Sequence, residues 1–239
     1  MTRPCILHLE TATNICSVAV SKGDKLAALR ESSEEKSHAR LLSVFIREAL
    51  QEASLKAADL DAVAVSKGPG SYTGLRIGVS TAKGLGYGLN IPVIGIITLR
   101  AMAAGALIIP AIQSLQKQSD PPLLLCPMLD ARRMEVYTGL YTPLLKPVQE
   151  ISAVILDKTS FREQLENHRM VFFGNGMPKF RETVTHPNAV FNQDVVPSAQ
   201  FMIPLALEAF HDRKFEDVAY FEPFYLKDFI ATTPRKKVL

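Results

Sequence analysis

The stretch Lys67-Gly68-Pro69-Gly70-Ser71-Tyr72-Thr73-Gly74-Leu75-Arg76-Ile77-Gly78 decides how the fold of this chain is interpreted. It follows an apolar run at 61–66 that predicts a strand, and it opens a helical pattern over 73–89. A glycine-rich turn between a strand and a helix brings backbone N–H groups to the positive end of the helix dipole. The first hypothesis is therefore an anion-binding loop built on Gly68, Gly70, Ser71 and Thr73.

The loop matches neither of two common phosphate-binding patterns. Walker A needs GxxxxGK[ST], and no glycine stands five residues after Gly68 or Gly70. The dinucleotide fingerprint fails at its sixth position, where Thr73 replaces glycine. A tight turn in which Ser71 or Thr73 caps the helix is an equally open interpretation.

The helix after this loop has a stripe of small residues, Gly74, Gly78, Ala82 and Gly86, spaced four apart on one side. An interior glycine costs roughly 1 kcal/mol relative to alanine, so we expect close approach of another backbone to compensate. Two partners remain open for the stripe: the protein's own sheet and a helix of another subunit.

Working outward from the loop, the first hundred residues predict a βββαβαβ order. Three strands form an antiparallel meander, a helix with Leu42 and Phe45 on its apolar side follows, and the parallel crossovers come next. The strands are expected at 5–10, 16–20, 25–31, 61–66 and 92–97, with helices at 37–53 and 73–89. This order favours a mixed sheet with helices on its faces.

The second half roughly repeats this plan. A helical stretch at 99–115 leads to a polar segment, 116–122, that ends in Pro121-Pro122 and is typical of a connection between lobes. Strands are then expected at 123–128, 135–141, 148–156 and 170–174, and helices at 160–167 and 198–215. We therefore predict two α/β lobes, residues 1–115 and 116–239.

The densest polar cluster is Asp130-Ala131-Arg132-Arg133-Met134-Glu135-Val136-Tyr137, between two predicted strands. It is either a charged hairpin turn or a binding loop in which an Arg fork such as that of Arg132 holds a carboxylate, a phosphate or a partner side chain. Asp130 and Arg132 are accordingly candidate site residues.

Composition excludes several classes of protein. The chain has 239 residues, of which 47% are hydrophobic and three are widely separated cysteines, so neither disorder nor a disulfide scaffold is indicated. A net charge of +3 does not identify a nucleic-acid binder without a localised patch. The longest apolar run, 101–112, is shorter than the roughly 20 residues of a membrane helix. We expect a cytoplasmic protein without membrane association.

Motifs for catalysis are also missing from the sequence. No two of the five histidines have HxxxH or HExxH spacing, and there is no GxSxG nucleophile motif. No metal ligands are therefore predicted in this chain.

Three segments of the sequence resemble the TsaB (YeaZ) family. They are the first strand end Glu10-Thr11-Ala12-Thr13 with Cys16-Ser17-Val18-Ala19, the stretch 67–78, and the cluster 130–137. The segment Pro223-Phe224-Tyr225-Leu226-Lys227 is similar to the family's Pro-x-Tyr-x-basic ending.

The resemblance implies the actin-like (ASKHA) fold, with two lobes that each have a mixed β-sheet flanked by helices. For a chain with these motifs it implies a part in forming N6-threonylcarbamoyladenosine at position 37 of tRNAs reading ANN codons. In the family, TsaB is the non-catalytic partner of its paralogue TsaD, which carries the metal and transfers threonylcarbamoyl, and the ATPase TsaE joins them. ATP and metal are thus expected to be used by the partner subunits, with no cofactor bound strongly by this chain alone.

Family members pair through their first two helices, here 37–53 and 73–89. The expected partner-binding residues are Leu42, Phe45, Gly74, Arg76, Gly78, Ala82 and Gly86. The resemblance implies a TsaD-type catalytic subunit and a TsaE-type ATPase as partners, with a homodimer as a further option. Contact with tRNA is expected to be indirect or weak.

One departure from the family pattern bears on chemistry, and a second, at Tyr72, is mild because it retains the aromatic ring. Glu10 stands where actin-like ATPases have Asp, and Ala12 replaces Ser; the longer carboxylate weakens the case for Mg-nucleotide chemistry there. Tyr72 replaces the more usual Phe. An actin-like nucleotide-binding kinase or ATPase is the alternative function, whereas a peptidase would need a nucleophile or metal constellation that the sequence lacks.

Overall fold

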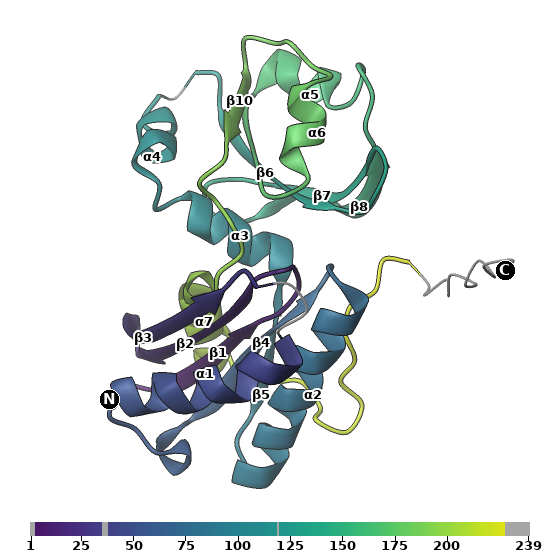
Figure 1. The fold of residues 1–239 in the computed structure, drawn as a ribbon. Helices are drawn as coiled ribbons and strands as arrows, with labels where there is room; N and C mark the ends of the chain where they lie inside the picture. The colour runs from purple at the N-terminus through teal and green to yellow at the C-terminus, as the bar shows by residue number, and fades with distance from the viewer. Residues whose placement is uncertain (1–2, 35–37, 119, 228–239) are drawn as a thin grey trace, which may run out of the picture.

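The computed structural model describes residues 3–34, 38–118 and 120–227 and shows two lobes, one above the other in Figure 1. The N-lobe is built on a sheet of order β3-β2-β1-β4-β5, and the C-lobe on a sheet of order β8-β7-β6-β9-β10. The N-lobe strands are β1 (Cys5–Glu10), β2 (Cys16–Lys22), β3 (Lys25–Ser32), β4 (Ala62–Gly68) and β5 (Val93–Ile97). The C-lobe strands are β6 (Leu123–Asp130), β7 (Glu135–Tyr141), β8 (Pro147–Ile155), β9 (Arg169–Phe173) and β10 (Ala189–Asn192).

The two sheets follow one plan. In the N-lobe, β1, β2 and β3 pair antiparallel, and β4 and β5 are added in parallel beyond β1. In the C-lobe, β6, β7 and β8 pair antiparallel, and β9 and β10 are added in parallel beyond β6. This duplicated arrangement, with helices on the sheet faces, confirms the predicted actin-like fold.

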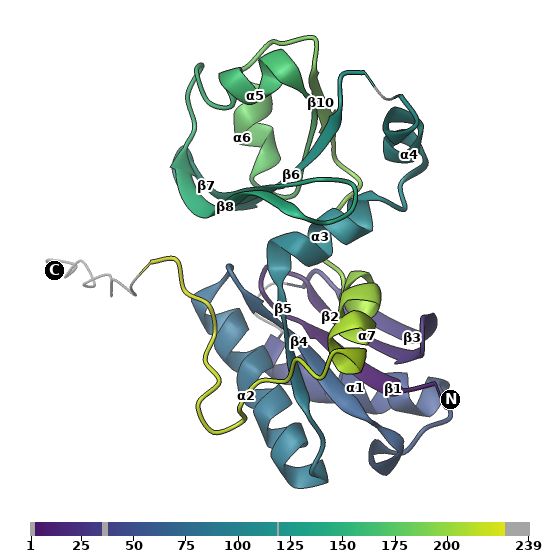
Figure 2. The ribbon, with the colours of Figure 1, turned by 180° about the vertical axis from the view of Figure 1, so that it is seen from behind.

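Helices cover both faces of the N-lobe sheet. Helices α1 (His38–Glu52) and α2 (Tyr72–Leu89) lie on one face, while α3 (Thr98–Ala106) and α7 (Ile203–His211) lie on the other (Figures 1 and 2). Along β1, Leu7 and Leu9 face α1 and α2, whereas Ile6 faces the α7 side, and all three are fully buried. Because both faces are covered, the central strands are apolar almost throughout. A short turn of 3-10 helix, η1 (Ala57–Asp59), precedes β4.

The C-lobe sheet is also covered on both faces. One face packs against α3 and α4 (Pro110–Gln116), and the other against α5 (Arg162–Asn167) and α6 (Met177–Arg181). Phe180 of α6 packs edge-on against Phe172, with the ring centroids 4.9 Å apart. No single described helix is long and apolar enough to cross a membrane, although α3 and α4, which meet at an angle of 84°, pass the same length and composition criteria as a bent pair.

Helix α3 joins the two lobes. Ala101 and Ala104 belong to the N-lobe core, whereas Met102 and Ala106 belong to the C-lobe core. The predicted connection at 116–122 is therefore wrong: Ile112 of α4 already packs in the C-lobe core. The predicted single helical stretch 99–115 is broken between α3 and α4, before Pro110.

The end of the described chain returns to the N-lobe, so the predicted division at 1–115 and 116–239 is wrong for the last part. Residues 199–211, which form η2 (Ala199–Met202) and α7, pack on the N-lobe sheet. Residues 212–227, here called the strap, then run along the same lobe. In the strap, Glu216 N–H donates to Val93 O over 2.8 Å, and Phe221 is buried in the N-lobe core.

Candidate functional site

The glycine-rich loop between β4 and α2 is a helix cap that rests on the turn after β1. Ser71 is the N-cap residue of α2, and its Oγ accepts a hydrogen bond from Gly74 N–H over 3.3 Å. The Ser71 N–H donates to Ala12 O over 2.6 Å. Thr73 is exposed in the first turn of α2. The capping interpretation is thus confirmed for Ser71.

The loop glycines are explained by close approach of the chain's own backbone. Gly68 has φ of +117°, and a Cβ there would overlap the carbonyl oxygen of Phe224 in the strap. A Cβ on Gly70 would overlap Ala12 O. These two residues therefore need no ligand to account for them, and anion binding by this loop stays a prediction.

The small-residue stripe of α2 also faces the chain's own lobe. All four members are buried: Gly74, Gly78, Ala82 and Gly86. A Cβ on Gly78 would overlap Thr11 Oγ1, and one on Gly86 would overlap Val93. The prediction that this stripe binds a partner is therefore wrong, because the β1–β2 turn and the sheet already cover it.

Of the other predicted partner-binding residues, Leu42 is wrong for the same reason, since it is 2% exposed within the N-lobe core. Phe45 is half-buried at the edge of that core. Arg76 is exposed and lies over the Tyr72 ring, with its guanidinium carbon 5.3 Å from the ring centroid. Phe45 and Arg76 can thus contact a partner in the folded chain.

The outward side of α2 carries a second set of small residues that the sequence interpretation did not select. Ser80, Gly84 and Gly88 are exposed, and a Cβ on either glycine would meet no atom of residues 3–34, 38–118 and 120–227 within 4 Å. The signal was available, because Arg76, Ser80, Gly84 and Gly88 are also four apart. Sequence spacing gives two parallel stripes, and only burial separates them.

The turn after β1 is held by hydrogen bonds within the chain. Glu10 is 1% exposed, and burial raises the pKa of its carboxyl to about 7 despite hydrogen bonds from Ala12 N–H and Ser66. The Ala12 N–H donates to Glu10 Oε1 over 2.6 Å, and the Ile15 N–H donates to Thr13 Oγ1 over 3.2 Å. Two N–H groups of this turn, those of Ala12 and Ile15, are thus already bonded to side chains of the turn itself.

The predicted polar cluster forms the tight turn between β6 and β7. Asp130 Oδ1 accepts hydrogen bonds from Arg132 N–H over 2.6 Å and from Lys179 Nζ over 2.5 Å. Burial acts to raise the pKa of Asp130, but these bonds outweigh it and lower the pKa below the usual value. Asp130 therefore shapes the turn, while the Arg132 side chain is exposed.

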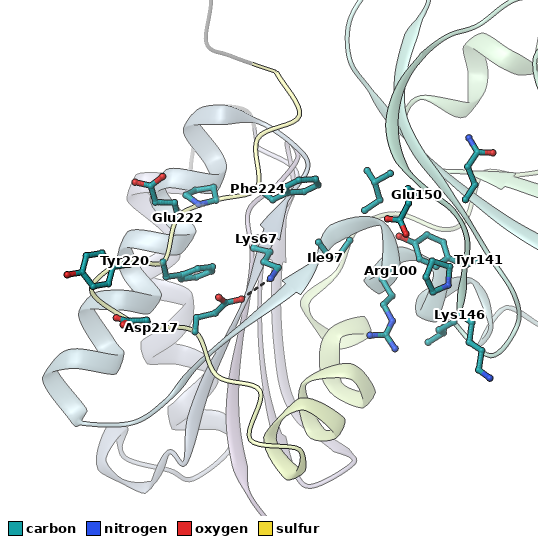
Figure 3. Close-up of a pocket in the computed structure, with 17 residues that line it drawn as sticks. Lys67, Ile97, Arg100, Tyr141, Lys146, Glu150, Asp217, Tyr220, Glu222 and Phe224 are labelled. Atoms are coloured by element: carbon teal, nitrogen blue, oxygen red, sulfur yellow. Dashed lines mark hydrogen bonds and ion pairs between the residues drawn. The ribbon is translucent and has the colours of Figure 1, made fainter.

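A cavity of about 880 Å³ lies between the lobes beside the strap (Figure 3). Lys67 and Phe224 line its N-lobe side, and Tyr141 lines its C-lobe side. Lys67 Nζ is 2.8 Å from Glu216 Oε1, so its charge is compensated within the chain. Burial raises the pKa of Tyr141 to about 12, which keeps its hydroxyl protonated.

This cavity has the volume of a ligand site, and Lys67, which directly precedes the predicted anion-binding loop, lines it. No residue of the turns at 11–15 and 131–134 lines it. The buried Nε of Arg100, at its edge, makes no hydrogen bond within the described part of the chain, so an acceptor group would find a donor there. Within residues 3–34, 38–118 and 120–227, no group of three or more His, Cys, Asp or Glu residues could hold a metal ion.

The two sheets of one plan, each covered by helices on both faces, define an actin-like protein of two lobes. The model of the family TsaD, tRNA N6-adenosine threonylcarbamoyltransferase, matches residues 31–234. The tRNA threonylcarbamoyladenosine biosynthesis protein TsaB of Escherichia coli (strain K12) is 31% identical over 232 residues, which covers 95% of this chain and 96% of that protein. The chain therefore belongs to the TsaB (YeaZ) family, within the wider group that the TsaD model describes.

Other relatives support the same family assignment. TsaB of Haemophilus influenzae is 27% identical over 232 residues, 93% of each chain. The solved structure of YeaZ from Pseudomonas aeruginosa superposes with a TM-score of 0.76 at 25% identity and covers 93% of this chain and all of that one. The family assignment from sequence motifs is confirmed, and with it a role in tRNA threonylcarbamoyladenosine biosynthesis.

Proposed function

We propose that this chain is the non-catalytic partner of a TsaD-type subunit in the formation of N6-threonylcarbamoyladenosine, with a TsaE-type ATPase acting on the pair. The exposed side of α2 carries the proposal. Glycine lowers helix stability, and Gly84 and Gly88 have open space where a side chain would stand, so no contact among the described residues accounts for them. A second helix packed closely against α2 would account for both.

The surroundings of these glycines suit a helix–helix contact. Phe45 of α1 and Ile77 of α2 are half-buried hydrophobic residues at the edge of the same core. Helices α1 and α2 lie side by side on one face of the N-lobe (Figure 1). We call the surface formed by Phe45, Ile77, Ser80, Gly84 and Gly88 the pairing face. A second copy of the chain would compete with the TsaD-type subunit for it.

The geometry of the turn after β1 supports leaving ATP and metal chemistry to the partner subunits. Because Ala12 and Ile15 N–H groups are bonded to Glu10 and Thr13, a nucleotide would have to displace these contacts. We expect a calorimetric titration of the isolated chain with MgATP to show no binding. Saturable heat would instead favour the alternative, an actin-like ATPase or kinase. Because the substrate is a tRNA, we also propose that the reaction takes place in the cytoplasm.

The test compares Gly84→Leu with a matched control, Ala111→Leu. Leucine at position 84 blocks the close approach, whereas Ala111 is an exposed residue of α4 away from the pairing face. We expect Gly84→Leu to melt like the wild type. Its Kd for the TsaD-type subunit should rise about 100-fold or more, a loss of about 3 kcal/mol of binding free energy that also reduces co-purification. Reconstituted tRNA modification should need the chain and fail with Gly84→Leu.

Two results would contradict this proposal. One is full modification of tRNA in the absence of the chain, which would show that it is no activator. The other is undiminished pairing of a folded Gly84→Leu protein, which would place the interface elsewhere. Ala111→Leu should behave as the wild type in both assays.

A further inference from the structure

The turn between β6 and β7 presents two arginines in an unfavourable backbone conformation. Arg132 has φ of 71° and Arg133 has φ of 48°, in the left-handed region that favours Gly and Asn. Both side chains are exposed, and neither makes an ion pair within the described residues. Successive strained residues persist where the surrounding structure fixes them, often at functional positions.

The surrounding structure does fix this turn. Asp130 N–H donates to Asn175 Oδ1 over 2.9 Å, and its carboxylate binds Lys179 and the backbone of Arg132. Glu135 closes the turn, because its N–H donates to Arg132 O and its O accepts from Ala131 N–H, each over 3.1 Å. The two guanidiniums therefore extend from a rigid base, which lowers the entropy lost when they bind.

The strap brings further groups to the same place. Lys227 pairs with Glu135, and the Tyr225 ring lies on the Tyr72 ring with a centroid distance of 5.0 Å. Arg76 in turn lies over Tyr72. The end of the strap thus joins the first turn of α2 to the β6–β7 turn across the two lobes. We call this set the cleft-mouth patch: Tyr72, Arg76, Arg132, Arg133, Lys179, Tyr225 and Lys227.

The cleft-mouth patch concentrates positive charge. Its five cations are accompanied by three carboxylates, those of Asp130, Glu135 and Glu222, which leaves a net charge of +2. The whole chain carries only +3, so composition conceals a local excess of this kind. Tyr225 is exposed, and the charge of Arg76 acts on its hydroxyl. Exposed guanidiniums and an exposed aromatic ring on one surface suit phosphates and an unpaired base.

We infer that the cleft-mouth patch is a contact surface for the tRNA substrate, with Arg132 and Arg133 on backbone phosphates and Tyr225 stacked on an unpaired base. The inference rests on the proposed function and goes beyond it, because it gives this chain a direct contact with RNA. The patch adjoins the N-terminal end of α2, whereas Gly84 and Gly88 lie toward the C-terminal end. A subunit packed on Gly84 and Gly88 would therefore leave the patch at the other end of α2 open to RNA.

The test measures binding of an unmodified transcript of a tRNA reading an ANN codon to the complex with the TsaD-type subunit. Arg132→Gln/Arg133→Gln removes two charges and leaves two shorter, uncharged polar side chains. We expect it to raise the Kd about tenfold at about 0.1 M salt and to reduce the slope of log K against log salt by about 1.5. Tyr225→Leu should raise the Kd about fivefold with an unchanged slope.

The matched control is Lys25→Gln/Lys117→Gln, which removes two exposed cations at β3 and the end of α4, across the molecule from the strap in Figure 1. It should bind within about twofold of wild type, with nearly the same slope, because distant charges are screened. Wild-type Kd and slope for Arg132→Gln/Arg133→Gln would overturn the inference. Loss of pairing in that variant would also overturn it, since the patch would then be a protein contact. Failure of the proposed function would look different from these two results for Arg132→Gln/Arg133→Gln. In that case the wild-type chain itself would neither pair with the TsaD-type subunit nor activate it.

Discussion

Helix α2 carries glycines on two sides, and the two sets stand in different surroundings. On the inward side, Gly74 and Gly78 are covered by the β1–β2 turn, where a single Cβ would overlap Thr11. On the outward side, Gly84 and Gly88 face open space. The inward glycines are thus required by the fold, and the outward glycines are available to a partner. Their difference separates the residues that build the lobe from those that we assign to the pairing face.

The largest effect that tests this difference is expected at Gly78. Gly78→Leu would force a side chain into Thr11 and Val65, which lie at the centre of the N-lobe. We expect the substitution to cost more than about 4 kcal/mol and to prevent stable folding, since overlap with a packed core cannot relax locally. Thermal melting by circular dichroism is the measurement. A cooperative melt within about 3 °C of wild type would mean that the inward stripe is not packed as described.

The fold explains why the sequence predicted the stripe but not its surroundings. A period of four residues shows that something approaches α2 closely, whereas the identity of the neighbour depends on tertiary structure. The same limit applies to residues 199–211, which pack on the N-lobe sheet. Their amphipathic pattern would be the same if they packed on the C-lobe, so it could not predict which lobe they cover. The strands 5–10 and 135–141 were predicted with their correct bounds, because their apolar runs end at clear polar turns. In contrast, α6 and β10, with five and four residues, are too short to establish a period.

For the candidate site, the sequence located both turns but not the strap. Ser71 as a cap follows from local chemistry, and so does the Asp130 turn. The contacts of Tyr225 with Tyr72 and of Lys227 with Glu135 join residues far apart in the chain, so no local pattern predicts them.

A second test concerns the turn that covers the inward glycines. Burial raises the pKa of Glu10 from 4.5 to about 7, so the folded chain holds this proton more tightly than the unfolded chain does. The stabilisation is complete below about pH 4.5 and is lost as the pH rises through 7, by about 3 kcal/mol at most. Glu10→Gln should remove this dependence and be the more stable protein at about pH 8.

Denaturant titrations of Glu10→Gln and wild type at about pH 5 and pH 8 measure this difference. Burial lowers the pKa of the neighbouring His8 to about 3, which gives stability an opposite dependence at acid pH. Both proteins contain His8, so the difference between them isolates Glu10. Parallel stability curves for the two proteins would show that Glu10 titrates normally and that the turn is open to solvent.

A third test lies between the two sides of α2, where Lys83 holds the strap. Its Nζ donates to Ala219 O over 3.2 Å and to Phe221 O over 3.0 Å. Lys83→Met keeps the aliphatic stem and removes both bonds, so we expect a loss of about 1–2 kcal/mol, reduced by partial solvent exposure. Proteolysis within residues 212–227 should become faster, while pairing should change little. Weakened pairing with unchanged proteolysis would place Lys83 on the pairing face instead.

The smallest expected effect is a change in stability that has opposite signs on the two sides of α2. Gly84→Ala adds a methyl group into open space and removes the flexibility of a helical glycine, so it should stabilise the isolated chain by up to about 1 kcal/mol. The inward counterpart Gly74→Ala should destabilise it, because the Cβ would overlap the backbone of Thr11. If the outward glycine is retained for a close helix contact, Gly84→Ala should also weaken pairing several-fold. A protein that is both more stable and equally well paired would leave the outward glycine without a purpose and the pairing face without its main support.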